Sequence, residues 1–456
     1  MERKVNFMTK VITYGTYDLL HYGHIRLLER AKELGDYLIV GVTSEDFDRG
    51  RGKINVQQSL MERIAALEAT GIPDQIVVEE YEGQKIDDIQ RYGVDIFTVG
   101  SDWEGYFDYL NEYCKVVYLD RTQGVSSSQL RSENRELNIG LVGNKEDNIL
   151  SKYYREFSFV NGASTSALCT SNPDLAKEMK DKMEFITEDY SELLTKCDAV
   201  YLVSNPEKHY EQVKEALEAG KHVLCESPIA LKKEQTEELF ALAKSKNLVL
   251  MDAIKTAYAM AYNRLVLLCK SGRIGDIVSV DATCTSLRDE VTENKDLEGL
   301  WNSICAWGPT AMLPIFHILG TDYKDARIYS RFVPGVEDFD NFSKVDFTYG
   351  NAVASLKVGR GVKSEGELIV SGTKGYIYVP APWWKTDYFE IRYENQNENK
   401  RYFYKLDGEG IRYELVAFLR AIEASATKNI YVDQSISEGI TKIVEDFYSG
   451  NLIKLG

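Results

Sequence analysis

The sequence of 456 residues has few of the features that mark membrane-spanning, secreted or nucleic-acid-binding proteins. It contains no run of about 18 apolar residues, and residues 1–10, MERKVNFMTK, lack the apolar segment of a signal peptide. Positive charge is also scarce. The chain has 54 lysines and arginines but 71 aspartates and glutamates, which gives a formal net charge of −17. Polyanions and anionic lipids attract basic surfaces, so we expect a cytoplasmic protein that binds neither nucleic acid nor membrane.

Cysteine is scarce and scattered, which argues against a disulfide framework or a cysteine-rich metal site. The seven cysteines are odd in number, and none belongs to a C-x-x-C pair. We expect reduced thiols in the core, and the sequence leaves any metal ligands in the protein unknown. The positions are Cys114, Cys169, Cys197, Cys225, Cys269, Cys284 and Cys305.

Histidine is rarer still, with five in the chain, and two of them stand in the most distinctive stretch, residues 11–34. Residues 11–14 (VITY) predict a buried strand, and residues 15–18 (GTYD) a glycine-bearing turn. Apolar residues then recur at helical spacing, with His21 and His24 at the start of the predicted helix. A helix N-terminus offers unpaired N–H groups to phosphate, and imidazoles there can donate to a phosphoryl group in the transition state. The alternative is a connection that merely contains two histidines.

This stretch resembles, almost residue for residue, the nucleotidyltransferase signature of the glycerol-3-phosphate cytidylyltransferase family. In that family the histidines of H-x-G-H bind the triphosphate and stabilise the departing pyrophosphate. Residues 121–128, RTQGVSSS, resemble the second signature of the family, R-T-x-G-[IV]-S-[ST]-[ST], whose turn and hydroxyls can hold phosphate at a helix N-terminus. The resemblance covers about residues 10–133. It implies CTP as substrate, with Mg²⁺ on its triphosphate.

The segment between the two signatures adds positive charge. Arg51 and Lys53 match the spacing of family lysines that contact the triphosphate, although a solvated loop is the usual meaning of such a run. Arg63 lies near a phosphate-binding arginine of the family. Asp102, in a segment that resembles the family's DDWEG, either orients the ligand or caps a helix. Where the family carries a further arginine, this chain reads Ala-Thr-Gly at residues 69–71.

The resemblance thus implies two sets of site residues in the first domain. Strands and helices alternate there, which predicts a parallel sheet with its site at the carboxyl ends of the strands. Arg121 can supply a forked, permanently charged donor for base or phosphate. The implied catalytic residues are His21, His24, Lys53 and Arg121, and the implied nucleotide-binding residues are Gly15, Thr16, Tyr17, Asp18, Gly23, Arg51, Arg63, Asp102, Thr122, Gly124, Ser126, Ser127 and Ser128.

From residue 137 the pattern restarts with a new strand and an incomplete G-x-G-x-x-G turn. Residues 198–239, which include GKHVLCESP, resemble the Gfo/Idh/MocA oxidoreductase family, whose hallmark is GKHVLCEKP. Residues 301–320 resemble the substrate-site helix of that family, and later alternating segments fit its antiparallel sheet. The resemblance spans residues 137–456. The cofactor-binding residues it implies are Gly140, Gly143, Ser171, Ser204, Glu226 and Pro228.

Several groups that carry the chemistry of this second family are missing. The family's lysine is Ser227 here, and the positions of its catalytic aspartate and histidine fall near Ala306 and Thr310. The segment at residues 169–172 (CTSN) lacks the acid that would bind an NAD ribose, which favours NADP over NAD. We predict that Lys255, with Tyr258, replaces the lost groups as proton donor, although an exposed lysine after a strand is the alternative. His209 and His317 are expected to be structural.

The sequence therefore predicts an α/β protein. We expect a Rossmann-like nucleotidyltransferase domain at residues 1–133, a second Rossmann domain at 137–258, and an α+β domain with a largely antiparallel sheet at 259–456. The leading hypothesis is a homo-oligomeric cytidylyltransferase that makes a CDP-polyol, with glycerol phosphate as the best guess, for cell-surface polysaccharide or teichoic acid precursors. A linked NAD(P)-dependent module would act on a related sugar or polyol phosphate. The alternatives are a second part that only binds or dimerises, and an adenylyltransferase that uses ATP.

Overall fold

A computed structural model describes most of the chain, and it divides into two compact units, residues 1–135 and 136–456. The expected boundary at residue 258 stays a prediction, because both sheets of the second part belong to one unit. The described residues are 8–20, 22–44, 47–48, 56, 58, 60–81, 83–120, 137–144, 149–160, 162–287, 301–336, 338–404, 406, 408–423 and 431–455, without the side chains of 62, 102, 149 and 423.

The first unit is built on a five-stranded parallel sheet in the order β3-β2-β1-β4-β5. Its strands are nearly continuous apolar runs, as expected where both faces of a parallel sheet are covered. The strand order reverses between β1 and β4, and such switch points are where open α/β sheets bind ligands, at the carboxyl ends. The strands are β1 (Lys10–Gly15), β2 (Tyr37–Thr43), β3 (Gln75–Glu79), β4 (Ile96–Gly100) and β5 (Lys115–Leu119).

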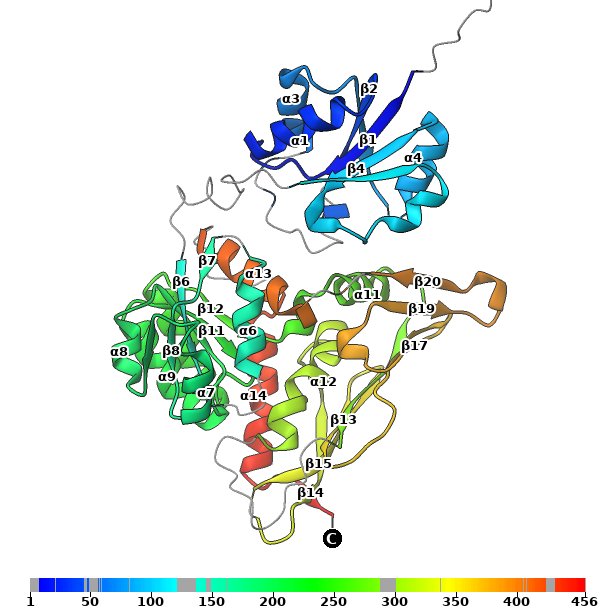
Figure 1. The fold of residues 1–456 in the computed structure, drawn as a ribbon. Helices are drawn as coiled ribbons and strands as arrows, with labels where there is room; N and C mark the ends of the chain where they lie inside the picture. The colour runs from blue at the N-terminus through cyan, green and yellow to red at the C-terminus, as the bar shows by residue number, and fades with distance from the viewer. Residues whose placement is uncertain are drawn as a thin grey trace, which may run out of the picture. The chain divides into compact units, whose positions relative to one another are not determined.

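Helices cover both faces of this sheet. On one face α1 (Tyr22–Lys32) and α3 (Leu60–Thr70) bury Leu28 and Leu67 against β1 and β2. On the other face α4 (Gln84–Tyr92) buries Ile89 against the opposite side chains of the same strands (Figure 1). The short 3₁₀ helices η1 (Ser101–Trp103) and η2 (Asp108–Glu112) connect β4 to β5.

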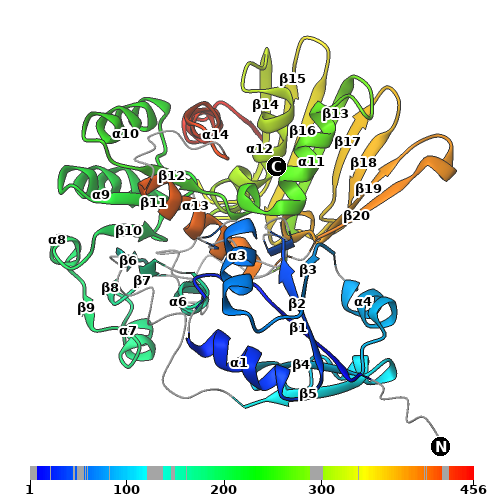
Figure 2. The same cartoon turned by 90° about the horizontal axis from the view of Figure 1, so that it is seen from above.

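The second unit begins with another parallel sheet, in the order β12-β11-β10-β6-β8-β9, with β7 paired to β6. Apolar residues of α8, α9 and α10 pack on one face (Figure 2). The strands are β6 (Leu137–Val142), β7 (Ala163–Ser164), β8 (Ala167–Cys169), β9 (Phe185–Thr187), β10 (Ala199–Leu202), β11 (His222–Glu226) and β12 (Leu250–Ala253). The helices are α6 (Ile149–Phe157), α7 (Pro173–Met179), α8 (Tyr190–Leu194), α9 (Pro206–Glu218) and α10 (Lys233–Ser245).

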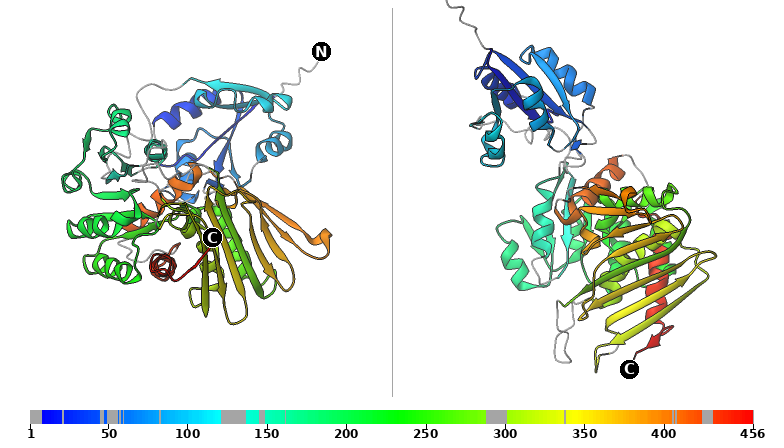
Figure 3. Two further views of the ribbon diagram at one scale, coloured as in Figure 1. Left: turned by 90° about the horizontal axis from the view of Figure 1, so that it is seen from below. Right: turned by 90° about the vertical axis from the view of Figure 1, so that its right-hand side faces the viewer.

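A nine-stranded sheet follows, in the order β20-β19-β18-β17-β13-β16-β15-β14-β21. The pairs β13–β16 and β14–β21 are parallel and the others antiparallel. Figure 3 shows the face away from α11 and α12. The strands are β13 (Ile277–Ser286), β14 (Asp325–Phe332), β15 (Asp340–Thr348), β16 (Val353–Arg360), β17 (Leu368–Gly372), β18 (Tyr376–Val379), β19 (Tyr388–Arg392), β20 (Lys400–Phe403) and β21 (Ile453–Lys454).

The remaining helices join the two sheets of the second unit. Along one face of the large sheet lie α11 (Met260–Lys270) and α12 (Ser303–Leu319), and α14 (Gln434–Tyr448) packs against α10 and α12. The helix α13 (Ile411–Glu423) packs on α6. The described residues of this unit also form the 3₁₀ helices η4 (Lys255–Tyr258), η5 (Trp383–Lys385), η6 (Gln396–Glu398) and η7 (Gly408–Gly410).

The architecture confirms the predicted fold class, two parallel sheets followed by a mixed, mostly antiparallel one. All seven cysteines are free thiols, as expected, and six of them are buried. Within the described ranges no helix combines the length and apolar character needed to cross a membrane.

Candidate functional site

The turn after β1 carries the first group of predicted site residues. Tyr17 and Leu19 have φ angles of 54° and 45°, in the left-handed region. Such a backbone costs a non-glycine residue on the order of 1–3 kcal/mol, so surrounding contacts must hold it. The Tyr17 ring is buried over Gly15, where an added Cβ would lie 2.9 Å from a ring carbon. Glycine is therefore required at the end of β1.

His24 lies in the first turn of α1, directly after this turn. Its imidazole meets the Tyr17 ring edge-on, with 5.5 Å between the ring centroids and 72° between the planes. Gly23 precedes it in the helix, and His21 lies outside the described residues. The structure thus places His24 at a helix N-terminus, as the sequence predicted, and seats its ring on a buried aromatic side chain.

A buried ion pair ties the loops at the carboxyl edge together. Arg63 of α3 is fully buried, and its Nη1 donates to the carbonyl oxygens of Thr16 at 2.8 Å and Thr43 at 2.9 Å. The same nitrogen lies 3.4 Å from Oδ2 of the buried Asp48. Asp48 in turn accepts from the hydroxyls of Thr16 at 3.0 Å and Thr43 at 2.6 Å. The guanidinium therefore holds the ends of β1 and β2 in fixed relation.

Gln58 links the same turn to the start of α3. Its backbone N–H donates to Asp18 at 2.9 Å, and its side-chain oxygen accepts from the Leu19 N–H at 2.9 Å. Nε of Arg63 donates to the Gln58 carbonyl at 3.2 Å. Thr16, Asp18 and Arg63 thus have a positioning role in the described structure, and their contacts with a nucleotide stay predictions.

The rest of the predicted nucleotide site lies outside the described residues, so it also stays a prediction. Asp102 belongs to η1, directly after β4, with its side chain outside the described part. The undescribed predicted residues are His21, Arg51, Lys53, Arg121, Thr122, Gly124, Ser126, Ser127 and Ser128.

Sequence reasoning missed a polar cluster on the other face of this sheet. Asp88 of α4 accepts from the Tyr14 hydroxyl at 2.8 Å and from Gln84 at 3.1 Å. Lys85 pairs with Glu79 at the end of β3, and its Nζ lies 4.6 Å from the Tyr14 ring centroid. Burial and the neighbouring Asp88 raise the pKa of Tyr14. The signal was present in residues 84–88, QKIDD, since residues three or four apart on a helix share one face.

In the second unit the two predicted glycines have different surroundings. Gly140 lies inside β6, where an added Cβ would be 3.1 Å from the Cys197 sulfur, so its small size serves packing. Gly143 follows the strand, and a Cβ there would lie 2.8 Å from the Val203 carbonyl oxygen. Asn144, next in the turn, accepts from the backbone N–H of Ser171 at 2.7 Å. The turn after β6 is therefore joined to the turn after β8.

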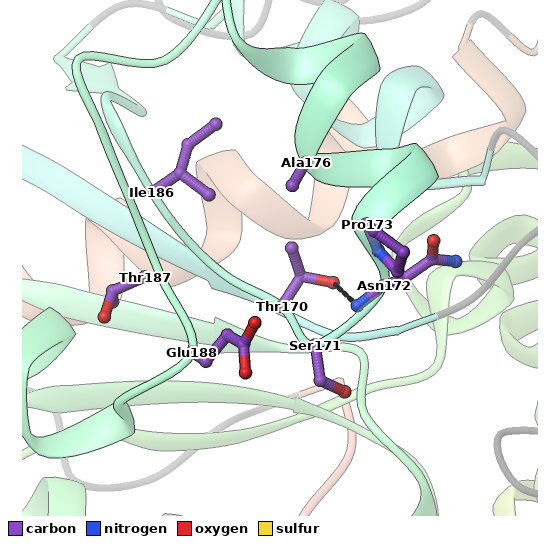
Figure 4. A pocket seen from close by; sticks show the side chains of 8 residues that line it. All are labelled: Thr170, Ser171, Asn172, Pro173, Ala176, Ile186, Thr187 and Glu188. Atoms are coloured by element: carbon purple, nitrogen blue, oxygen red, sulfur yellow. Dashed lines mark hydrogen bonds between the residues drawn. The ribbon is translucent and has the colours of Figure 1, made fainter.

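A small open pocket of about 200 Å³ lies where β8 and β9 end. In Figure 4 the carboxylate of Glu188 points toward Thr170 and Ser171. Burial, then the nearby acids Asp189, Glu188 and Glu215, raise the pKa of the Cys169 thiol to about 11, which indicates negative potential at the end of β8. The lining residues are Thr170, Ser171, Asn172, Pro173, Ala176, Ile186, Thr187 and Glu188.

Sequence reasoning looked for an acid only after β8 and missed Glu188, which stands after the neighbouring strand β9. The local signal was present, because FITED reads as a strand followed by acids, but the pairing of β9 with β8 was needed to bring Glu188 here. An acid from the end of β9 therefore lies beside the end of β8, whose own residues 169–172 carry none.

The other predicted cofactor residues lie at the carboxyl ends of β10 and β11. The Tyr153 hydroxyl of α6 donates to Glu226. The His209 ring is fully buried between two backbone carbonyl oxygens, 2.7 Å from that of Pro228 and 2.9 Å from that of Ser204. His209 is thus structural, as expected, and it fixes the two strand ends together.

The positions at which the second family has its catalytic groups lie in the same region. Register pairs Glu226 with Ala253, so Ser227 and Lys255 follow neighbouring strands, as predicted. The Lys255 side chain is 30% exposed, and its Nζ lies 3.6 Å from a Glu409 carboxylate oxygen. It is therefore a paired, partly solvated amine, and its role as proton donor stays a prediction. Ala306 and Thr310 lie on α12, where they bring no ionisable side chain.

Two further candidates are structural. The Tyr258 hydroxyl, buried, donates to the backbone carbonyl of Asp252 at 2.7 Å. The His317 ring lies 2.9 Å from the Tyr262 hydroxyl and 2.7 Å from the Tyr431 carbonyl. Burial lowers the pKa of His317 to about 4, so it is neutral at physiological pH, as a structural histidine should be.

Two buried carboxyls lie close to the parallel sheet of the second unit. Asp252 of β12 accepts from the Ser437 hydroxyl at 2.8 Å, and burial raises its pKa to about 7. Glu414 of α13 accepts from the Tyr201 hydroxyl of β10, and burial raises its pKa to about 8. These protonatable groups join α13 and α14 to the sheet, and sequence inspection did not single them out.

Comparison with known proteins agrees with this geometry. Residues 12–166 match a family model described as cytidylyltransferase-like, and residues 137–253 match one described as an oxidoreductase family with an NAD-binding Rossmann fold. The glycerol-3-phosphate cytidylyltransferase of Bacillus spizizenii is 48% identical over 130 residues, which are 28% of this chain and 100% of that protein. The Staphylococcus aureus protein of the same name is 47% identical over 126 residues, 28% of this chain and 95% of that protein.

The second unit has its own relatives. An uncharacterized oxidoreductase of Escherichia coli, YhhX, is 31% identical over 193 residues, 41% of this chain and 55% of that protein. A 3-ketoreductase from Actinomadura kijaniata, KijD10, solved with NADP and TDP-benzene, shares the fold with a TM-score of 0.61. It is 19% identical and covers 70% of this chain and 99% of its own.

The chain therefore joins a cytidylyltransferase-like domain to an NAD(P)-binding Rossmann oxidoreductase module. Its first unit belongs to the glycerol-3-phosphate cytidylyltransferase family, and residues 137–253 of its second unit match the Gfo/Idh/MocA oxidoreductase family model.

We predict that Arg63→Gln destabilises the first unit by about 3–5 kcal/mol, because it leaves the buried Asp48 without its charged partner. Urea denaturation, followed by fluorescence, measures the free energy of unfolding. Arg26→Gln is the matched control, since Arg26 forms an exposed pair with Glu29, and such pairs contribute less than about 1 kcal/mol. Equal stability of the two variants would contradict a scaffolding role for Arg63.

We predict that Asp252→Asn removes a pH dependence of stability. Between pH 3.8, the ordinary pKa, and about 7, the unfolded chain is ionised at this residue while the folded protein holds the proton. The unfolding free energy therefore falls as pH rises through this window. The variant should melt a few degrees higher than the parent at pH 8 and equally at pH 4. Asp281 is exposed, so Asp281→Asn serves as control. It should not alter the difference in melting temperature between pH 4 and pH 8.

Proposed function

We propose that the first unit transfers CMP from CTP to the phosphate of a small polyol phosphate, with glycerol phosphate the leading candidate, and releases pyrophosphate. The main support is 48% identity over the full length of a glycerol-3-phosphate cytidylyltransferase. The position of His24 at a helix N-terminus beside the turn after β1 agrees with that activity. Its product would feed cell-surface polysaccharide or teichoic acid synthesis.

The reaction needs positioning more than covalent chemistry. An oxygen of the acceptor phosphate, already ionised at neutral pH, attacks the α-phosphorus and displaces pyrophosphate. His21 and His24 donate to the phosphoryl oxygens as charge builds up on the leaving group, and Arg51, Lys53 and Arg121 add positive charge. Arg63 and Asp48 keep the turn in place.

Mg²⁺ would be held chiefly by the triphosphate oxygens, which it neutralises. The acids nearest the turn in the described structure are already engaged, since Asp48 accepts from two threonines and Asp18 accepts from Gln58. Within the described ranges, no three His, Cys, Asp or Glu side chains converge as a protein-held metal site.

For the second unit we propose NAD(P)-linked oxidation or reduction of a sugar or polyol phosphate related to the substrate of the first unit. Two linked activities suit consecutive steps, such as reduction of a keto compound followed by activation of its product. A module that only binds is the second candidate, and specific observations favour it. Ser227, Ala306 and Thr310 bring no ionisable group where the family has three, and the turn after Gly143 lacks the third glycine of the motif.

The pocket at β8 and β9 supports NAD rather than the NADP that sequence reasoning favoured. A carboxylate can accept hydrogen bonds from ribose hydroxyls but repels a 2′-phosphate. Glu188 brings such a carboxylate to the pocket, and the residues described in its lining include no lysine or arginine. We therefore propose that the adenosine ribose of NAD binds beside Glu188.

We predict that His21→Ala or His24→Ala lowers turnover about 100-fold or more, as for loss of one transition-state donor. The melting temperature should barely change. Pyrophosphate release would be measured across CTP and ATP with several polyol phosphates, and Tyr22→Phe, an exposed neighbour in α1, should keep parental turnover. Full activity of both histidine variants would contradict a catalytic role for His21 and His24. Transfer of AMP without transfer of CMP would contradict CTP as the substrate.

We predict that NADH binds at least about tenfold more tightly than NADPH, because a carboxylate next to a 2′-phosphate costs more than about 1 kcal/mol. Isothermal titration would give both dissociation constants. Glu188→Gln should bring the two dissociation constants closer together by strengthening NADPH binding. Glu184 is an exposed acid before β9, and Glu184→Gln should leave the ratio of the two constants unchanged. Tighter NADPH binding by the parent would contradict the assignment.

A further inference from the structure

Three lysines from separate parts of the second unit converge on one carboxylate. Oxygens of Glu409 lie 2.9 Å from Nζ of Lys385, 3.6 Å from that of Lys255 and 3.6 Å from that of Lys152. These lysines belong to η5, η4 and α6, which are far apart in sequence. We call Lys152, Lys255, Lys385 and Glu409 the lysine cluster. With three positive charges and one negative, it carries a net charge of +2 in a protein of net charge −17.

The backbone beneath Glu409 is unusual. Gly408, Glu409 and Gly410 have φ angles of 59°, 55° and 94°, so three successive residues are left-handed. For glutamate this conformation is costly, and strain of this kind concentrates at functional sites. A Cβ on Gly408 would fall 1.7 Å from a Glu156 oxygen, so the segment sits directly on α6.

Among the described residues, two neighbouring carboxyls do not cancel this positive charge. Glu156 is engaged by Arg412, with 2.8 Å between Nε and the carboxylate, so that pair is neutral as a whole. Glu414 has a pKa raised to about 8 by burial and holds its proton at pH 7. Burial alone would raise the pKa of Glu409, but the three lysines outweigh it and lower that pKa to about 2, so Glu409 stays ionised.

The position of the cluster suits a substrate more than the dinucleotide. Lys255 directly follows β12, next to the end of β11 where the family's lysine is absent. The proposed ribose pocket lies at β8 and β9, on the other side of the sheet order. Trp384, beside Lys385, stacks edge-on against Trp307 of α12, with 5.0 Å between ring centroids, and offers an apolar wall.

We propose that Lys152, Lys255 and Lys385 bind the phosphate of a small phosphorylated carbonyl or polyol substrate. A phosphomonoester carries a charge of about −2 at pH 7, which matches the net charge of the cluster. Each ammonium has three donors, so each keeps donors for a phosphate beyond its bond to Glu409. The inference rests on the proposed function of the second unit only for the identity of the rest of the ligand.

The test uses binding, so that its failure is distinct from failure of the oxidoreductase activity. Full-length protein would be titrated calorimetrically with dihydroxyacetone phosphate and with dihydroxyacetone, without nicotinamide cofactor. The phosphorylated ketone should bind and the other should not. Lys385→Met and Lys255→Met should each weaken binding of the phosphorylated ketone at least tenfold. Lys385→Arg should keep most of it, because the charge remains.

Lys344→Met is the matched control, because Lys344 pairs with Asp346 on the large sheet at similar exposure. It should bind like the parent, and melting curves of all variants would check folding. Equal binding by Lys385→Met and Lys344→Met, or equal binding of the two ketones, would overturn the proposal. A parallel NADH titration separates the two sources of phosphate. If Lys385→Met weakens the binding of NADH as strongly as the binding of the phosphorylated ketone, the lysines bind the dinucleotide and the proposal fails.

Discussion

Parallel strands that are buried on both faces can present polar groups only where they end, and this constraint governs both units. The strands of the first sheet and of the Rossmann sheet are mostly apolar, and Asp252 in β12 is a buried exception. Their chemistry is therefore confined to the carboxyl edge, where backbone groups leave the sheet and helices begin. The turn after β1 and the ends of β11 and β12 are the places where each unit can meet a ligand.

At these edges, buried charge fixes loops that the sheet itself does not hold. Taking Arg63 and Asp48 out of water costs several kcal/mol per ion. In exchange, one guanidinium joins the turn after β1 to the segment after β2. His209 does the same between two carbonyls in the second unit. Such groups contribute little net stability but define one geometry, which a site for a small phosphorylated ligand requires.

The two units would recognise phosphate by different means. In the first, a helix N-terminus with His24 offers backbone donors at close range, and Gly15 gives the turn the room it needs. In the second, the turn after Gly143 has lost glycines that let a backbone approach phosphate. Long side chains can contact a phosphate that the backbone cannot approach, and the lysine cluster consists of such side chains.

By itself the sequence determined the fold class, the families that its two parts resemble and the places of His24 and Lys255 in the chain's strands and helices. His24 at the start of α1 and Lys255 after β12 follow from contiguous patterns, because strand and helix periods are local properties of the chain. Only the tertiary structure decided which distant side chains meet. Arg63 turned inward to scaffold a turn, Glu188 reached the pocket at the ends of β8 and β9 through strand pairing, and Glu409 gathered lysines from three elements. These outcomes depend on strand order and side-chain direction, which a single sequence does not encode at any one position.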